Sequence, residues 1–308
     1  MTLLEIFPHP SEAYANVGAG AGHSVGEITI AAAAGVLSAE QAMVFVRERG
    51  AAMAQAAAAT ATGMTAVLGG DSDEVLASIT THGLTAANMN GAGQVVAAGT
   101  IEQLDAFDAE PPAGARRIRL QVAGAFHTEH MHPAVSVLAG YARAMSTHDA
   151  RVPLISNADG RVVREGREVL TRLVTQVSNP VRWDLCMQTM ADMGVTALIE
   201  LPPAGTLAGL AKRALPGVEI VTVKTPDDLA AAHDLIARHG SGSAAADAPA
   251  WRLVVAPAKG TFRRSDAADE FTAGATVGTI TSLRETIEVL TPHAGMAVDR
   301  KSTRLNSS

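Results

Sequence analysis

The spacing of apolar residues changes several times along the chain, and each change predicts a new element. From Glu27 to about Ala59, apolar residues recur at helical spacing in two runs, ITIAAAAGVL and AEQAMVFVRERGAAMAQAAAA. Ser38 stands between the runs and is a typical N-cap residue. The pattern therefore predicts two consecutive helices, the second of which begins after Ser38.

Short apolar runs then alternate with helical patterns. The predicted strands are MTAVLG (64–69), GQVVAAG (93–99) and RRIRLQVA (116–123). The predicted helices between them are SDEVLASITTHG, capped by Asp71 or Ser72, and IEQLDAFDA. This order predicts a compact β–α–β–α–β block.

The alternation continues after residue 130. The predicted helices are PAVSVLAGYARAMST, EVLTRLVTQV, WDLCMQTMADMG and GTLAGLAKRAL, and the predicted strands are VPLISN, ALIELPP and EIVTVK. Helices that alternate with strands are typical of the α/β class, so the expected fold is α/β with a largely parallel sheet.

The pattern breaks at GSGSAAADAPA (240–250), a run of small residues without periodicity that is typical of a linker. The following segments, WRLVVAPAKGTFRR and ATVGTITSLRETIEVLTPHAGMAV, read as short strands joined by glycine and proline turns. We therefore expect a small all-β module after the linker. The final residues, RKSTRLNSS, are polar and continue neither pattern.

Composition narrows the classes of function. The formal net charge of −7 over 308 residues argues against a general nucleic-acid binder, which would carry a basic excess. Cys186 is the single cysteine and cannot form an internal disulfide, which favours a reducing compartment. No run reaches the roughly 20 apolar residues needed to span a bilayer, and the N-terminus lacks the pattern of a secretory signal. The chain is therefore expected to be cytoplasmic, without a membrane partner.

Ser24 stands between two glycines in GAGHSVGE, directly before the first predicted helix. Gly22 and Gly26 complete the pattern G-x-S-x-G, in which a strained turn exposes a nucleophilic serine at a helix N-terminus. The pattern is weak alone, and in a chain with 28 glycines an ordinary loop serine fits it about as well. A nucleophilic serine also needs a base, so the histidines decide between the two interpretations.

His127 follows a predicted strand and precedes a predicted helix in GAFHTEHMHPA. This is the edge of an α/β sheet at which active sites form, so His127 is the candidate base. His127, His130 and His132 match no zinc signature and no cysteine joins them, so no metal is expected.

Five motifs in this order resemble one family. GHSVGE, VRERGAAMA, AGAFHTEHMHPA, QVSNPVRW and ELPPAGTLAGLAKR follow one another as in malonyl-CoA:acyl-carrier-protein transacylases and the related acyltransferase domains of polyketide synthases. The likeness covers roughly residues 21–225. It implies transfer of malonyl from malonyl-CoA to the phosphopantetheine thiol of acyl carrier protein, in fatty-acid biosynthesis, with no bound cofactor.

The resemblance also implies roles for particular residues. Ser24 would be the nucleophile, His127 the general base and acid, and the backbone carbonyl of Gln176 would orient the imidazole. Arg49 would pair with the free carboxylate of malonyl, and the Val25 N–H would be one oxyanion donor. Phe126 and Val25 match the pattern of members that prefer malonyl, because a phenyl ring leaves no room for an α-methyl group. Five basic residues are candidates for docking the acidic carrier protein: Arg116, Arg117, Arg119, Lys212 and Arg213.

The chain departs from the family at both ends. The glycine–glutamine loop that supplies a second oxyanion donor is absent, so we expect the opening strand, several helices and the strand leading to the serine to be missing or replaced. The C-terminal module resembles a partial biotinyl/lipoyl-type barrel-sandwich domain. Arg284 occupies the position of its modified lysine, so no modification is expected. The last residues resemble a translated sequencing-adapter tail.

These observations predict the following organisation and alternatives. The expected segments are an unmatched stretch (1–20), an acyltransferase domain (21–238) with an inserted ferredoxin-like subdomain (about 62–121), a linker (239–250), the partial module (251–300) and an artefactual tail (301–308). Three alternatives stay open: a polyketide-synthase-type acyltransferase, a non-catalytic remnant that binds acyl carrier protein or CoA, and a serine hydrolase. Arg49 counts against a hydrolase, which needs no buried cation.

Overall fold

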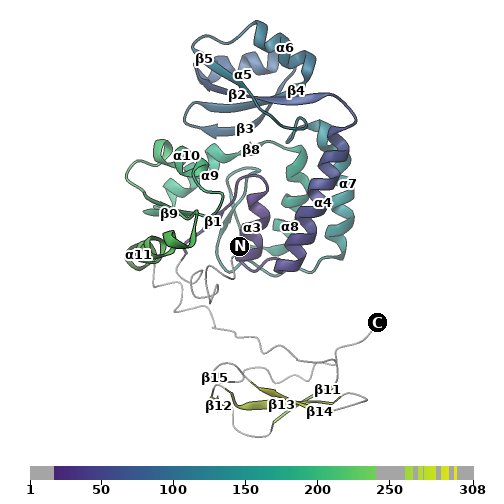
Figure 1. The fold of residues 1–308 in the computed structure, drawn as a ribbon, viewed down its shortest axis with the longest axis vertical. Coiled ribbons are helices and arrows are strands. Elements are labelled where there is room, and N and C mark those ends of the chain that lie inside the picture. The colour runs from purple at the N-terminus through teal and green to yellow at the C-terminus, as the bar shows by residue number, and fades with distance from the viewer. Residues whose placement is uncertain are drawn as a thin grey trace. The chain divides into compact units, whose positions relative to one another are not determined.

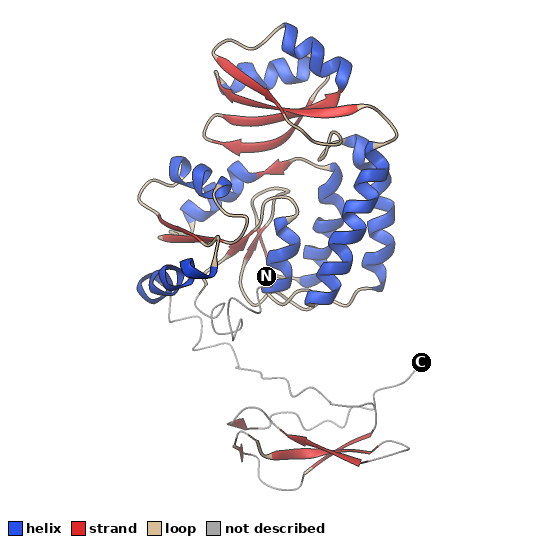
Figure 2. Cartoon of the chain, in the orientation of Figure 1, coloured by secondary structure: helices blue, strands red, loops and turns tan. Residues whose placement is uncertain are grey.

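The computed structural model describes residues 17–240 and five short stretches of the C-terminal part, 261–265, 270–272, 274–281, 286–290 and 295–296. Internal contacts divide the chain into two units, Met1–Ala245 and Ala246–Ser308. The first unit is a mixed α/β fold, and its helices and strands are drawn in Figures 1 and 2. No helix in the described ranges has both the length and the apolar character needed to cross a membrane.

One group of strands and helices in this unit surrounds the segment that contains Ser24. Strand β1 (Gly20–Ala21) runs parallel to β6 (Leu154–Ile155), which pairs antiparallel with β7 (Val162–Val163). The helices around them are α3 (Gly26–Ala33), α4 (Ala39–Ala57), α7 (His132–Ala144) and α8 (Gly166–Thr175). Their apolar faces form one core that includes Phe45, Leu138 and Leu170. A two-residue strand, β1, thus leads to the serine, where the sequence suggested that the family's strand is missing or replaced.

Ser38 begins α4 as the sequence predicts. Its hydroxyl accepts a hydrogen bond from the Gln41 N–H at 3.1 Å, and the Gln41 side chain accepts one from the Ser38 N–H at 2.8 Å. These reciprocal bonds satisfy two amides that a helix N-terminus leaves unpaired. The cap therefore fixes where α4 starts, and with it the position of Arg49 further along the helix.

The block between residues 62 and 119 forms most of a five-stranded sheet in the order β5-β2-β4-β3-β8. Its strands are β2 (Thr62–Gly69), β3 (Thr85–Gly91), β4 (Gln94–Thr100), β5 (Ala115–Arg119) and β8 (Val181–Arg182). Helices α5 (Ser72–Thr81) and α6 (Ile101–Ala109) pack on one face through a cluster that includes Ile79, Leu104 and Phe107. Asp71 caps α5 by accepting from the N–H groups of Asp73 and Glu74. Figure 2 shows both helices on the same side of the strands.

Two expectations about the sheets are wrong. The largest sheet is antiparallel apart from the β3–β8 pair, so the described strands do not form a largely parallel sheet. The sequence pattern also predicted one strand, 93–99, where the structure has the hairpin of β3 and β4. Helix–strand alternation does not reveal strand direction, and the alanine-rich run before Asn90 carries little β propensity. The glycines of the run Asn-Gly-Ala-Gly (90–93), which contains the two-residue turn Ala92-Gly93, are the hairpin signal that was overlooked.

The rest of the first unit packs around a second apolar cluster that includes Trp183, Cys186 and Leu210. Its elements are α9 (Trp183–Asp192), β9 (Ala197–Glu200), α10 (Thr206–Ala214), β10 (Glu219–Thr222) and α11 (Leu229–His239). Strands β9 and β10 pair in parallel, as expected for a β–α–β unit. Helix α11 was not predicted from the sequence.

The elements described in the second unit are all strands. Strands β11 (Thr261–Arg264), β13 (Thr276–Thr281) and β14 (Thr286–Leu290) form an antiparallel sheet. Strands β12 (Glu270–Phe271) and β15 (Gly295–Met296) form a second antiparallel pair. Ile280 and Val289 are buried in this unit. The strand expected at 251–260, the tail at 301–308 and Arg284 lie outside the described residues.

Candidate active site

Ser24 sits on a sharp turn between β1 and α3, which we call the elbow (residues 20–27). Its φ angle is +54°, a left-handed conformation that is rare for residues other than glycine. A Cβ atom on Gly22 would collide with the backbone carbon and oxygen of Gly26, so this position requires glycine. A Cβ atom on Gly26 would meet nothing within 4 Å. The first glycine of G-x-S-x-G is therefore a steric requirement here, and the second is not.

His127 contacts Ser24 directly. Its Nε2 atom lies 2.7 Å from the serine Oγ, and its Nδ1 atom lies 2.9 Å from the backbone carbonyl oxygen of Gln176. A carbonyl can only accept, so Nδ1 carries the hydrogen and Nε2 presents a lone pair to the serine hydroxyl. This is the hydrogen-bond arrangement by which a histidine removes a proton from a serine.

Burial sets the protonation state of this histidine. His127 is 4% exposed, and its backbone is fixed at φ +62° by a hydrogen bond from its N–H to Val177 O at 3.0 Å. Burial lowers the pKa of His127 to about 4, and the hydrogen bond to Gln176 only partly opposes this shift. The imidazole is therefore neutral at pH 7 and can accept a proton.

Arg49 extends from α4 to the same serine. One guanidinium nitrogen, Nη2, donates to Ser24 Oγ at 3.0 Å and to Gln176 Oε1 at 2.9 Å. Burial lowers the pKa of Arg49 to about 10, so the side chain still carries its charge at neutral pH. Within the described ranges no carboxylate lies at ion-pair distance from it, and its buried Nε atom has no hydrogen-bond partner. A buried cation with unused donors is suited to binding an anionic group.

Gln176 lies in a 3-10 turn, Gln176–Ser178, after α8. From the sequence, only its backbone carbonyl was expected to take part. The structure adds the side chain, which accepts from Arg49 and donates through Nε2 to Ser24 O at 2.7 Å and to Glu27 Oε2. Gln176 thus contacts His127, Arg49 and the elbow at once.

Val25 and Phe126 lie beside these groups. Val25 precedes the first residue of α3, so its N–H belongs to the positively polarised end of that helix. No hydrogen bond joins this N–H to another residue in the described part of the chain. Phe126 precedes His127 and packs, half-buried, against the helical core and the inserted sheet.

Two residues of the site were missed. Asn157 is fully buried; its Oδ1 accepts from the Ser24 N–H at 2.7 Å, and its Nδ2 donates to Gly22 O at 2.8 Å. Its own N–H donates to Glu27 Oε1 at 2.7 Å. Burial raises the pKa of Glu27 to about 7, against the opposing effect of its hydrogen bonds to Asn157 and Gln176. The position of Asn157 as the last residue of the predicted strand VPLISN is the signal that could have identified it, because polar residues at strand ends often serve sites.

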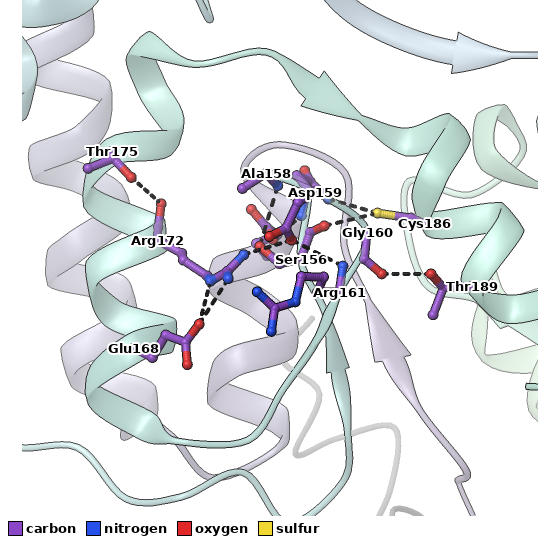
Figure 3. A network of polar contacts seen from close by, with 12 residues as sticks. Ser156, Ala158, Asp159, Gly160, Arg161, Glu168, Arg172, Thr175, Cys186 and Thr189 are labelled. Atoms are coloured by element: carbon purple, nitrogen blue, oxygen red, sulfur yellow. Dashed lines mark hydrogen bonds and ion pairs between the residues drawn. The ribbon is translucent and has the colours of Figure 1, made fainter.

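The loop that carries Asn157 is held between two helices (Figure 3). Asp159 forms an ion pair with Arg172 of α8 at 2.8 Å. On the other side, Cys186 Sγ donates to Ser156 O at 3.3 Å and Thr189 Oγ1 donates to Gly160 O at 2.7 Å, both from α9. These contacts join α8, the loop and α9 into one support for the elbow.

The inserted sheet reaches the site through Asn90. Its Oδ1 atom lies 2.9 Å from Nε2 of His23, the residue before the nucleophile candidate. The His23 ring also stacks edge-on against Trp183, with 5.5 Å between ring centroids. Burial lowers the pKa of His23. Asn90 thus contacts the elbow rather than Ser24 itself.

The five basic residues proposed for docking differ in their surroundings. Arg119 is paired with Asp105 and Asp108, and Arg117 donates to the carbonyl oxygens of Phe107 and Asp108. These two arginines therefore support the fold of the inserted block. Arg116, Lys212 and Arg213 form no ion pair within the described part of the chain, so they are the remaining candidates for docking.

Comparisons with known proteins find similarity to acyl transferases. A family model described as an acyl transferase domain matches residues 16–227. The malonyl CoA-acyl carrier protein transacylase of Mycobacterium bovis is 50% identical over 209 residues, which cover 68% of this chain and 69% of the relative. The crystal structure of MCAT from Mycobacterium tuberculosis superposes with a TM-score of 0.67 at 50% identity, covering 68% and 69% of the two chains. A malonyl-transacylase solved in complex with its type II PKS acyl-carrier protein, PlMCAT:AntF, superposes with a TM-score of 0.66 at 30% identity, covering 70% and 72%.

Proposed function

This chain belongs to the acyl transferase family of malonyl CoA-acyl carrier protein transacylases, and we propose that it transfers malonyl from malonyl-CoA to the phosphopantetheine thiol of an acyl carrier protein. The single observation that carries the proposal is the surroundings of Ser24 Oγ. This atom lies 2.7 Å from a neutral imidazole nitrogen and 3.0 Å from an arginine without a carboxylate partner among the described residues. A base and an anion-binding cation thus meet at one nucleophile.

In the first half of the reaction, Ser24 Oγ attacks the thioester carbonyl carbon of malonyl-CoA. His127 Nε2 takes the hydroxyl proton as the new ester bond forms, and the Val25 N–H donates to the oxyanion that develops. When the intermediate collapses, the C–S bond breaks and the sulfur of CoA leaves with the proton from Nε2. The product is malonyl-serine, with neutral His127 restored.

In the second half, the phosphopantetheine thiol of the carrier protein gives its proton to His127 Nε2 and attacks the ester carbon. The C–O bond to Ser24 breaks, and the serine oxygen takes the proton back. Two exchanges through an ester replace one direct transfer between thiols. The Gln176 carbonyl stabilises the imidazolium that forms transiently in each half, because it accepts from Nδ1.

Arg49 would select the acyl group. Its planar guanidinium can bind both oxygens of the malonyl carboxylate, which acetyl lacks. Phe126 would limit the space beside His127, so that an α-methyl group is excluded. A packed wall of this kind is worth about 1–3 kcal/mol per methyl group.

The proposal extends to partners and organisation. Acyl carrier protein is the expected partner, and Arg116, Lys212 and Arg213 are the candidates for its docking. Residues 21–238 would form the acyltransferase domain, in which the block at 62–121 is a ferredoxin-like subdomain. Residues 251–300 would form a partial barrel-sandwich module without a modified lysine. We place the protein in the cytoplasm, in fatty-acid biosynthesis.

Intact-protein mass spectrometry after mixing with malonyl-CoA tests the proposal. We expect a malonyl adduct on the wild-type chain, none on Ser24→Ala, and an undiminished adduct on the control Ser136→Ala, which changes an exposed serine of α7. Addition of holo acyl carrier protein should remove the adduct and produce malonyl-carrier protein. A folded wild-type chain without an adduct would instead support a non-catalytic remnant, and loss of malonyl to water without transfer would support a hydrolase.

A further inference from the structure

The Gln176 side-chain amide lies between two buried charges. Its Oε1 atom accepts from Arg49 Nη2 at 2.9 Å, and its Nε2 atom donates to Glu27 Oε2. Glu27 and Arg49 are both buried, and within the described residues they form no direct ion pair. The carboxylate and the guanidinium therefore interact through an amide bridge.

The neighbours of the bridge determine its orientation. Arg49 has only donors, so it must face the amide oxygen, whereas the carbonyl of Ser24 has only an acceptor and must face the amide nitrogen. Glu27 presents a second acceptor on the nitrogen side. With both acceptors in place, the amide oxygen is directed at the guanidinium and holds it beside Ser24 Oγ.

Glu27 is itself held firmly. Its other oxygen, Oε1, accepts from the Asn157 N–H at 2.7 Å, on the loop that α8 and α9 clamp. Both described partners of the carboxyl group are donors, which favours its ionised form. Burial opposes ionisation and raises the pKa of Glu27 to about 7, while the nearby charges of Arg172 and Arg49 favour the ionised form, so the carboxyl group ionises near neutral pH. Glu27 contacts neither Ser24 Oγ nor His127 by any hydrogen bond, so it can act on the site only through other residues.

A direct ion pair and an amide bridge have different consequences for Arg49. A carboxylate in direct contact would occupy the donors of the guanidinium and compete with an anionic substrate. Through the bridge, Glu27 offsets part of the cost of a buried positive charge while the remaining donors of Arg49 stay unoccupied by a carboxylate. The arrangement keeps the cation both charged and available.

We infer that Glu27 is a positioning residue that, through the Gln176 amide, sets the preference of this site for an acyl group with a free carboxylate. The inference rests on the proposed function and adds to it a determinant of specificity that does not touch the substrate. It predicts that removing the charge of Glu27 affects malonyl transfer more than acetyl transfer, because acetyl has no carboxylate for Arg49 to bind.

The test compares kcat/KM for malonyl-CoA with kcat/KM for acetyl-CoA in the wild-type chain and in Glu27→Gln. The substituted amide can still accept from Asn157, but its NH2 group would face the NH2 group of Gln176. One of the two amides must turn. If the Gln176 amide turns, Arg49 loses its acceptor; if the introduced amide turns, the Asn157 N–H loses its acceptor and the bridge loses its anchor on that loop. We expect the malonyl-to-acetyl ratio to fall by about tenfold or more, the range typical for losing a hydrogen bond to a charged group.

A matched control changes a carboxylate that supports structure elsewhere in the same unit. Glu200 accepts from the N–H groups of Gly205, Leu207 and Ala208 at the start of α10, at 2.8 to 2.9 Å. Glu200→Gln should lower thermal stability and leave the ratio as in the wild type. This control separates loss of a structural carboxylate in general from loss of the bridge.

A second variant, Gln176→Met, keeps the main-chain carbonyl that His127 needs and removes the bridge. It should lower the ratio in the same direction, and it carries the test if Glu27→Gln does not fold. An equal loss of malonyl and acetyl transfer in whichever variant folds would overturn the inference and leave the proposed function standing. A wild-type chain that shows no preference for malonyl-CoA would overturn the proposed function, and the inference with it.

Discussion

The tripeptide Gly-Ala-Gly begins the elbow at residues 20–22 and contains the β3–β4 turn at residues 91–93. In the hairpin, Ala92 and Gly93 have φ angles of +50° and +73°, and Gly91 pairs with Gln94. Positive φ at both central positions is the two-residue turn that matches the twist of antiparallel strands. The hairpin is therefore specified by its own residues and the ladder on each side.

In the elbow, the comparable positive φ belongs to Ser24, whose carbonyl accepts locally from the Glu27 N–H at 3.0 Å. Side chains more than 130 residues away hold it: Asn157 bonds the Ser24 N–H, and Gln176 bonds the Ser24 carbonyl. The same glycine-rich composition thus gives a self-contained turn in one place and a strained turn with remote support in the other. The difference shows that a functional elbow is a tertiary feature that local sequence permits and does not enforce.

The largest expected effect comes from blocking the elbow itself. Gly22→Ala places a Cβ atom against the backbone of Gly26, which we expect to destabilise the chain by about 1–3 kcal/mol, as overpacking usually does. It should also slow malonyl-serine formation about a hundredfold or more, because the nucleophile is displaced. Burst kinetics with malonyl-CoA and thermal unfolding measure the two effects. Gly26→Ala is the control and should keep activity, so equal damage in both variants would contradict the steric argument.

A second prediction concerns the stability of the folded chain in acid. Protonation of His127, which bonds Ser24 in the elbow, should lower this stability, and the hairpin turn has no corresponding group. The pKa of His127 is about 4 in the folded chain, whereas an unperturbed histidine side chain has a pKa of 6.5. Between these two values the unfolded chain binds a proton that the folded chain does not bind. The free energy of unfolding therefore falls as the pH drops from about 6.5 towards 4. The full contribution of His127 to the free energy of unfolding is about 3 kcal/mol.

Urea unfolding at several pH values, in the wild type and in His127→Gln, measures this contribution. The variant is needed because Glu27 changes the stability in the opposite direction. Its pKa is raised to about 7 in the folded chain, so its ionisation lowers the free energy of unfolding as the pH rises from about 4.5 through 7. The difference between the two curves isolates His127. Parallel curves between pH 7 and pH 4 would show that the histidine titrates normally.

The smallest expected effect is in the hairpin. Ala92→Gly removes the strain of a left-handed alanine but adds freedom to the unfolded chain, so we expect a gain in stability of no more than about 1 kcal/mol. Malonyl-serine formation should be unchanged. Urea unfolding and the same burst assay check both points. A large loss of activity would mean that the hairpin turn and the elbow are coupled more strongly than the Asn90–His23 contact implies.

Much of the fold could be predicted from local signals. The caps at Ser38 and Asp71 were correct because a side chain and an amide two or three residues apart decide them. The spacing of apolar residues gave α4, α7, α8 and α9 for the same reason. Strand direction and the β3 strand were not predicted, since pairing between distant segments decides both.

The site divides in the same way. Ser24 and His127 were proposed from motifs, but their 2.7 Å contact depends on segments 103 residues apart, and no single-sequence pattern measures that distance. Gln176 was expected for its carbonyl, and its side-chain bridge was not. Asn157 and Glu27 were missed because their importance lies in partners and burial. An asparagine at a strand end and a glutamate in a first helical turn both have ordinary explanations.

The clamp around the Asn157 loop has a consequence for how the site opens. The elbow can open only when the hydrogen bonds of Asn157 to Gly22 and Ser24 break. We expect Asn157 to move away only when its loop separates from α8 and α9. Such a separation would expose the Asn157 side chain and disrupt the packing of both helices. We therefore expect the Ser24 amide hydrogen, which bonds Asn157 Oδ1, to exchange with solvent deuterium only when the loop separates from both helices.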